Sequence, residues 1–183
     1  EGFKGGVYTF RSENSSKQWA TSYDFGSIEN GHVVKTELPN GNLAQAQAYV
    51  FNLRRDKFKD PLVREALSMM FNFEWSNEQL FYGLYDRVNS FWGNSNLEAS
   101  GVPKAKELSI LQGLVDKGLL DVNVLTEPAV MAPVSGLRQL DRKNLRKASA
   151  LLDEAGWLVN DSGMREKNGQ AFTLEVLDSS PAF

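Results

Sequence analysis

The sequence predicts a mixed α/β fold, of α+β type, in which helices flank a mixed β-sheet. Two observations predict this class. Segments rich in β-forming residues alternate with segments of helical periodicity along the whole chain, and turn or cap residues separate them. A length of 183 residues and a hydrophobic fraction of 42% suit one globular core. We therefore expect a single domain over residues 1–183.

Three segments in the first third of the chain have the composition of strands. Residues 7–10 (VYTF) follow two glycines and are rich in β-forming side chains. Residues 32–38 follow the turn residues Asn30-Gly31 and precede a Pro-Asn-Gly stretch. Residues 46–53 are more continuously apolar, which predicts a strand that is covered on both faces.

The two strongest helix signals stand at Asp60 and Asp141. Each aspartate precedes an amphipathic segment and can cap the free amides of its first turn, and Pro61 suits a first helical position. Gly156 marks the end of the second helix. The predicted core-facing residues of the two helices are Val63, Ala66, Leu67, Met70, Phe71, Leu145, Ala148, Leu151, Leu152 and Ala155.

Weaker signals predict three further helices. One covers residues 15–23 and is capped by Ser15 or Ser16. A Ser-x-x-Gln capping box that begins at Ser76 predicts a second, and residues 104–114 have the periodicity of a third.

A hairpin and two loops complete the prediction. The Asn-Gly pair at 168–169 lies between residues 164–167 and residues 172–177, which is typical of a β-hairpin. Residues 89–101 are polar and contain glycine, and residues 127–136 contain two prolines, so both are predicted to be irregular.

Composition excludes several classes of function. The net charge of −3 and the absence of a basic run argue against nucleic-acid binding. No apolar stretch approaches the length of a membrane span, and no signal-like segment stands at the start. Because the chain opens and stops abruptly, at Glu1 and Phe183, we expect an excised or processed segment.

The sequence also lacks the residue combinations that known catalytic motifs require. The chain has no cysteine and one histidine, His32, which lies beside two valines and suits a strand edge or surface. No Gly-x-Ser-x-Gly elbow, phosphate-binding glycine loop or cysteine-ligated metal site occurs. The acidic pair Asp153-Glu154 lies on the polar side of a helix. We therefore predict that the chain is not an enzyme and needs no cofactor or metal.

Several segments, in order, resemble one family. Residues 47–73 (QAYVFNLRRDKFKDPLVREALSMMFNF) are similar to the central signature of the family 5 extracellular solute-binding proteins of ABC transporters. Residues 3–10, 147–157 and 170–177 are similar to an early strand element, a late helix and the strand after it. Four shorter segments resemble one branch of this family, the oligopeptide-binding, YejA-like branch. They are NSSKQWAT at 14–21, FEW at 73–75, LFYG at 80–83 and NSFW at 89–92.

The resemblance implies a function as well as a fold. The chain would be an internal fragment, a partial second lobe of a two-lobe periplasmic-binding-protein fold (type II, cluster C). The whole protein would be monomeric, would close on an oligopeptide and would deliver it to ABC permease subunits in the membrane. It would be periplasmic, or extracellular and membrane-associated. The family aspartate that pairs with a peptide amino terminus would lie beyond Phe183.

Nine residues are candidates for ligand binding. Four directly follow the first predicted strand, where α/β proteins place ligands, and could serve a peptide backbone or terminus. Three share one face of the third predicted strand, which the resemblance places near the crevice. Two tryptophans lie near polar loops and could line it. The candidates are Arg11, Ser12, Glu13, Asn14, Ala48, Val50, Asn52, Trp19 and Trp92.

A purely structural role remains an alternative for each of these residues. The first four could form an ordinary turn rich in helix-capping side chains, and the strand residues could pack in the core. Trp75 and Trp157 are expected in the core. Two alternative functions also remain: the same class with a non-peptide ligand such as a metal chelate, sugar or opine, and a protein-interaction domain without ligand.

Overall fold

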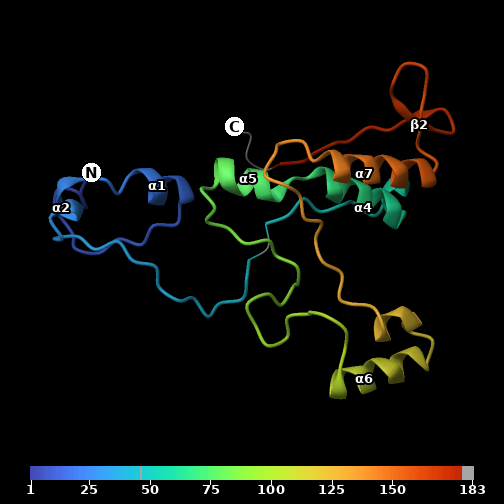
Figure 1. Cartoon of the computed structure of the whole chain (residues 1–183), viewed down its shortest axis with the longest axis horizontal. Helices are drawn as coiled ribbons and strands as arrows, with labels where there is room; N and C mark the ends of the chain where they lie inside the picture. Colours follow the sequence, from blue (N-terminus) through green and yellow to red (C-terminus); the bar gives the residue numbers. More distant parts are fainter. Residues whose placement is uncertain (46, 179–183) are drawn as a thin grey trace. The chain divides into compact units, whose positions relative to one another are not determined.

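The structure, a computed structural model, describes residues 1–45 and 47–178. Seven α-helices, one 3-10 helix and three short strands occur in these residues (Figure 1). The elements are α1 Ser16–Thr21, α2 Gly26–Glu29, α3 Asp56–Lys59, α4 Pro61–Met70, α5 Phe73–Leu80, α6 Ala105–Val115, η1 Val122–Leu125, α7 Arg142–Glu154, β1 Leu158–Val159, β2 Arg165–Lys167 and β3 Gln170–Ala171. The strands form one antiparallel sheet in the order β1-β2-β3. Helices with a small sheet confirm the mixed α/β class.

The chain divides into two compact units. One consists of Glu1–Ala48 and Phe73–Pro133, and the other consists of Tyr49–Asn72 and Val134–Phe183. We describe each unit by itself. The expectation of a single domain stays a prediction.

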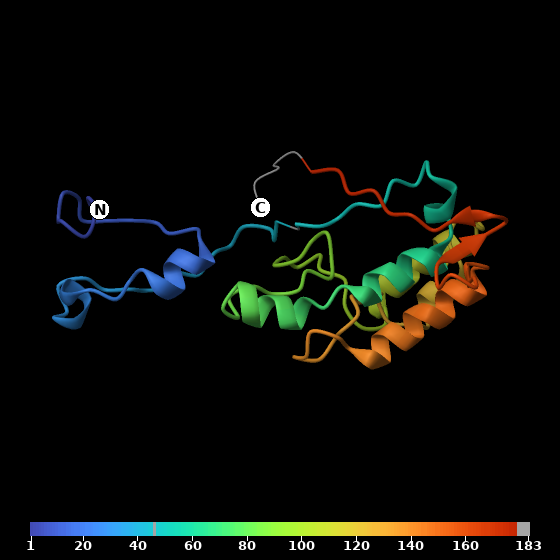
Figure 2. The ribbon, with the colours of Figure 1, turned by 90° about the horizontal axis from the view of Figure 1, so that it is seen from above.

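The core of the second unit is the contact between α4 and α7, which lie side by side (Figure 2). The residues buried there are Phe58, Val63, Ala66, Met69, Ala148, Leu152, Ala155 and Trp157. The predicted helix faces are confirmed for the most part, since five of these eight were expected from periodicity. Met70 and Phe71 are exposed, contrary to prediction. Helix α4 ends at Met70, and Met69 takes the buried position instead.

Aspartate caps begin both core helices, as predicted. Asp60 accepts a hydrogen bond from the Leu62 amide at 2.9 Å. Asp141 accepts from the Lys143 and Asn144 amides, each at 2.9 Å. These bonds satisfy amides that lack partners within the helix. The carboxylate form of Asp141 is favoured by its backbone hydrogen bonds, so its pKa lies below the ordinary value.

The predicted hairpin forms after α7 and returns onto the end of that helix. Asn168 and Gly169 have φ of 54° and 76°, the left-handed values that a tight hairpin turn requires. Gly156, at φ 82°, lets the chain leave α7. The second strand of the hairpin is Gln170–Ala171, directly after the turn, and residues 172–177, which were predicted to form it, are irregular.

The three strands predicted in the first third of the chain are wrong over the described residues. Residues 7–10, 32–38 and 47–53 are irregular, and Ala46 lies outside the described residues. Val50 is 89% exposed, so this segment is not covered on both faces. A strand needs a neighbouring ladder to satisfy its amides. β-forming composition identifies the segments but supplies no partner.

Two smaller expectations around α5 also fail. Helix α5 begins at Phe73, so Ser76 lies inside the helix and does not cap it. Trp75 is half-buried instead of sitting in the core, whereas Trp157 is buried as predicted. Helices α1 and α6 and the irregular segments 89–101 and 127–136 agree with the sequence analysis, apart from small shifts at their ends.

Candidate functional site

The candidate site is a hollow in the N-terminal part of the first unit. Its volume is about 210 Å³. Two of the nine predicted residues, Arg11 and Glu13, line it. The complete lining is Glu1, Phe3, Lys4, Arg11, Glu13, Gln18, Ser22, Tyr23 and Phe25.

Aromatic rings build the wall of this hollow. The ring of Phe3 lies 5.7 Å from Tyr8, 6.5 Å from Tyr23 and 6.4 Å from Phe25, between centroids. The Trp19 ring lies 5.7 Å from Tyr23. Tilted and edge-on pairs of this kind are favourable and pack side chains from distant positions together. We call these five residues the N-terminal aromatic cluster.

Lys35 contacts the N-terminal aromatic cluster at Trp19 and does not line the hollow. Its Nζ donates to the backbone oxygen of Trp19 at 2.6 Å and stands 4.4 Å from the centre of the Trp19 ring. Such a cation over an indole face is attracted by the ring electrons. The sequence analysis missed Lys35, Phe3 and Tyr23, because no local pattern links a residue at 35 with one at 19.

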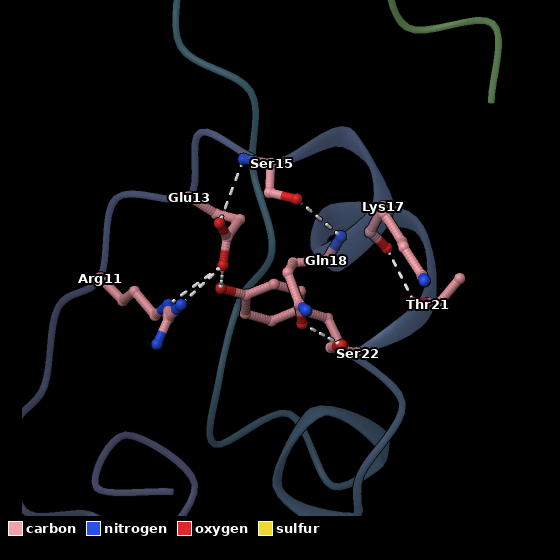
Figure 3. A network of polar contacts seen from close by, with 8 residues as sticks. Arg11, Glu13, Ser15, Lys17, Gln18, Thr21 and Ser22 are labelled. Atoms are coloured by element: carbon pink, nitrogen blue, oxygen red, sulfur yellow. Dashed lines mark hydrogen bonds and ion pairs between the residues drawn. The ribbon is translucent and has the colours of Figure 1, made fainter. Parts of the chain in front are cut away.

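Glu13 is the most fully bonded group at the site (Figure 3). Its Oε2 accepts from Arg11 Nη2 at 2.8 Å, from Arg11 Nε at 3.2 Å and from the Tyr23 hydroxyl at 3.0 Å. Its Oε1 accepts from the Ser15 amide at 3.1 Å. The Glu13 side chain is only 5% exposed. The carboxylate is therefore a fixed internal anion.

The network sets the charges at neutral pH. The Ser15 amide, followed by Tyr23 and Arg11, lowers the pKa of Glu13 despite partial desolvation. Desolvation and the bond to Glu13 raise the pKa of Tyr23. The bond to Glu13 raises the pKa of Arg11 further. Glu13 is thus ionised, Arg11 is cationic and Tyr23 keeps its proton as a donor.

Arg11 differs from Glu13 because part of it stays accessible. Its side chain is 39% exposed. The Nε and Nη2 atoms face Glu13, and one nitrogen of the guanidinium points away from that carboxylate (Figure 3). The Tyr8 hydroxyl also lies close enough to raise the pKa of Arg11. The arginine can therefore address a second acceptor while it holds Glu13.

The remaining residues predicted near the first strand do not line this hollow. Ser12 and Asn14 are exposed beside it. Trp19 is half-buried in the N-terminal aromatic cluster. Ser15, one of the two predicted caps, does cap α1, because its Oγ accepts from the Gln18 amide at 3.3 Å.

The structure does not support the shared strand face of Ala48, Val50 and Asn52. These residues lie in an irregular, exposed segment, and Ala48 belongs to a different unit from the other two. Asn52 accepts from the Arg54 amide at 3.1 Å, which is a local turn contact. Their role in ligand binding stays a prediction, without its strand geometry.

Trp92 is half-exposed near a second hollow but does not line it. That hollow has a volume of about 390 Å³ and is lined by Asn40, Asn42, Leu43, Ala44, Gln45 and Asn94. Asn94 closes one side by donating through Nδ2 to the Asn40 and Asn42 carbonyls at 2.9 Å and 2.7 Å. Its amide is thereby occupied within the chain.

Residues 1–45 and 47–178 contain neither a metal-binding cluster nor a membrane-spanning helix. No group of three metal-ligating side chains occurs in them. None of the helices in the same residues has the length and apolar character of a membrane span. His32 is exposed.

Comparison with known proteins identifies the family. The model of the bacterial extracellular solute-binding proteins, family 5 Middle, matches residues 2–183. An uncharacterized protein, y4wM, of Sinorhizobium fredii is 41% identical over all of this chain and 28% of its own length. The probable peptide-binding protein YejA of Agrobacterium fabrum is 41% identical over 98% of this chain and 30% of its own length. The peptidoglycan-binding protein YepA of the same organism is 32% identical over 92% of this chain and 27% of its own length.

These matches confirm the resemblance noted in the sequence, including its YejA-like branch. The chain spans less than a third of the length of these curated relatives. It belongs to the bacterial extracellular solute-binding proteins of family 5 and corresponds to their middle region.

Proposed function

We propose that the whole protein is the solute-binding component of an ABC importer and captures oligopeptides or peptide-like compounds. Two similarities carry the proposal: the family match covers residues 2–183, and a relative with 41% identity bears the name of a probable peptide-binding protein. The chain is a partial second lobe, and ligand is held as two lobes close on it. The binding protein then delivers the ligand to membrane permease subunits, whose ATPases supply the energy.

The chemistry of the N-terminal hollow supports this proposal. A peptide offers amides, carbonyls and a terminal carboxylate, and sequence-tolerant recognition addresses those groups. Arg11 and Gln18 offer donors toward the hollow, and Phe3, Tyr23 and Phe25 offer apolar walls. Ser12, Asn14, Trp19, Ala48, Val50, Asn52 and Trp92 are further contacts in this proposal, made in the full-length protein.

Further properties follow from the same proposal. The protein acts by binding and release instead of catalysis, uses no cofactor and works as a monomer. It resides in the periplasm, or outside the cell attached to the membrane, which agrees with a family described as extracellular.

Native mass spectrometry of the full-length protein, purified from its own compartment, tests the function. We expect the spectrum to contain a ladder of retained peptide masses. A single non-peptide mass would keep the transport class and contradict the peptide ligand. A protein free of ligand, which also ignores an added peptide library, would favour the interaction-domain alternative.

A second candidate ligand is a fragment of peptidoglycan, which combines amino sugars with a short peptide. The observation that favours it is the 32% identity with a peptidoglycan-binding protein over 92% of the chain. The same spectrum separates the two candidates, because the mass of a muropeptide exceeds that of its peptide by the mass of the sugars.

A further inference from the structure

We propose that Arg11 receives a carboxylate of the solute in the N-terminal hollow, and that Glu13 is its fixed counter-ion and no receptor for an ammonium group. The inference rests on the proposed function, because it names the ligand group that one part of the binding protein selects. Three features of the described residues carry it: the bonds that Glu13 already makes, the accessible second edge of Arg11 and the position of Lys4 at the wall of the hollow.

Little of the Glu13 carboxylate is left for a ligand ammonium. A carboxylate offers about four lone-pair sites. Four hydrogen bonds already reach Glu13, two from Arg11 and one each from Tyr23 and the Ser15 amide, at 2.8 to 3.2 Å. Its side chain is 5% exposed. Three of the four bonds fall on Oε2, so Oε1 keeps one lone-pair site, and the low exposure of the side chain hinders a ligand amine from reaching it.

Arg11 keeps one edge for a second carboxylate. A planar guanidinium presents two edges, one formed by Nε with a terminal nitrogen and one formed by the two terminal nitrogens. Nε and Nη2 point the first edge at Glu13. Because the side chain is 39% exposed, the edge formed by Nη1 and Nη2 can donate two parallel hydrogen bonds to a ligand carboxylate, in competition with the nearby Tyr8 hydroxyl.

The charged side chains that line the hollow balance one another, so the accessible edge of Arg11 is what favours an anion there. Arg11 and Glu13 neutralise each other, so the ligand meets Lys4 and the exposed Glu1 as the other charged lining residues. Lys4 is held at the wall, with Nζ 5.3 Å from the centre of the Phe25 ring.

The carboxylate can come from two sources, a peptide carboxyl terminus or an acidic side chain. The probes are therefore two libraries of tri- to pentapeptides that differ only in the last group, which is a free carboxylate or a carboxamide. Binding to the full-length protein is read by native mass spectrometry, which identifies each bound member by mass. We expect the free acids to bind at least about tenfold more tightly than neutral amides.

The pattern of bound members decides the outcome. Amidated peptides that bind only when they contain Asp or Glu would support the carboxylate site with a side chain as the source. Neutral amides that bind as tightly as acids would overturn the inference and leave the proposed function standing. A protein that binds no member of either library would instead contradict the peptide function itself.

Variants assign the effect to Arg11. Arg11→Gln should lower the affinity for free acids about tenfold to a hundredfold and so remove the preference for free acids over neutral amides. Arg142→Gln removes the same charge from an exposed position on α7 and should change neither the affinity for free acids nor the affinity for neutral amides. If circular dichroism shows that Arg11→Gln is unfolded, Arg11→Lys serves instead, since it keeps the charge and loses the two-pronged edge. An unaltered preference for acids in either folded variant would contradict the proposal.

A last variant tests the role given to Glu13. Under this proposal Glu13→Gln keeps the discrimination between free and N-acetylated peptides that the native protein has. A loss of that discrimination would show that Glu13 binds the peptide ammonium, which overturns the inference.

Discussion

The α4–α7 pair and the N-terminal aromatic cluster are held together by different forces. In the helix pair, Val63, Ala66 and Ala148 are fully buried and apolar contact dominates. The cluster contains no fully buried side chain and depends on ring edges, two lysines and the bonded carboxylate of Glu13. Burial fixes the first region as a scaffold, whereas polar bonds leave the second open to solvent and to a ligand.

The largest effect is expected in the helix pair. Leu152 is 1% exposed at the centre of the core. Leu152→Ala should destabilise this region by about 2–5 kcal/mol, because it removes buried apolar surface and leaves a cavity. Hydrogen–deuterium exchange of the α7 amides in the full-length protein measures the loss of protection.

The neighbouring Leu151 supplies the control for that experiment. It has the same side chain on the same helix but is only partly buried. Leu151→Ala should therefore cost clearly less than Leu152→Ala. Equal losses of protection would mean that helix propensity, and not core packing, holds α7.

The next effect concerns the polar clamp at the end of α7. Arg165 Nη1 donates to Asp153 at 2.7 Å and to the Trp157 carbonyl, and Nη2 donates to Ser149 Oγ at 2.6 Å. Arg165→Met should destabilise the end of α7 by about 1–3 kcal/mol, because these acceptors lose a charged donor. Hydrogen–deuterium exchange of the amides in the last turn of α7 measures this destabilisation.

Asp153→Asn separates the ion pair from the rest of the clamp. The Asp153 side chain is half-exposed, and exposed ion pairs contribute at most about 1 kcal/mol. We expect this variant to keep most of the protection that Arg165→Met loses. A loss as large as that of Arg165→Met would place the stabilisation in the ion pair and contradict the clamp.

Local pattern explains why the helix pair could be predicted. The capping side chains of Asp60 and Asp141 act within three residues, and the apolar stripe repeats within one helix. The turn at Asn168 likewise requires only its neighbour Gly169. Each of these features depends on a few neighbouring residues, so periodicity and capping residues were sufficient to predict it.

The candidate site could be predicted only in part, because its bonds join residues without a shared pattern. Arg11 and Glu13 were singled out as polar residues after a strand, but that strand is absent from the structure. The bond from Tyr23 to Glu13 spans ten positions, and the contact of Lys35 with Trp19 spans sixteen. No helical or strand period links such positions, so sequence reasoning had no signal for them.

Acid should loosen the N-terminal aromatic cluster and not the apolar core of the helix pair. The pKa of Glu13 is lower in the folded chain, so its contribution is present above the unfolded pKa, about 4.3. That contribution is lost as the pH falls through the lower folded value. The indole NMR signal of Trp19 should shift in that range. In Glu13→Gln the shift should disappear, and its persistence would place the titration elsewhere.

The smallest effect distinguishes the two roles of Ser15 at the start of α1. Its hydroxyl caps the helix, with a 3.3 Å bond from the Gln18 amide, while its own amide donates to Glu13. Ser15→Ala should weaken α1 by about 0.5–1 kcal/mol, at the low end for a cap. It keeps the amide that lowers the pKa of Glu13, so the acid midpoint of the Trp19 signal should stay unchanged. Ser16→Ala, at the first helical position, should change neither the helix nor the midpoint, and exchange of the α1 amides compares the two variants. A shifted midpoint in Ser15→Ala would mean that the cap and the carboxylate network act as one unit, so that ligand binding at Arg11 would depend on α1 as well as on the aromatic rings.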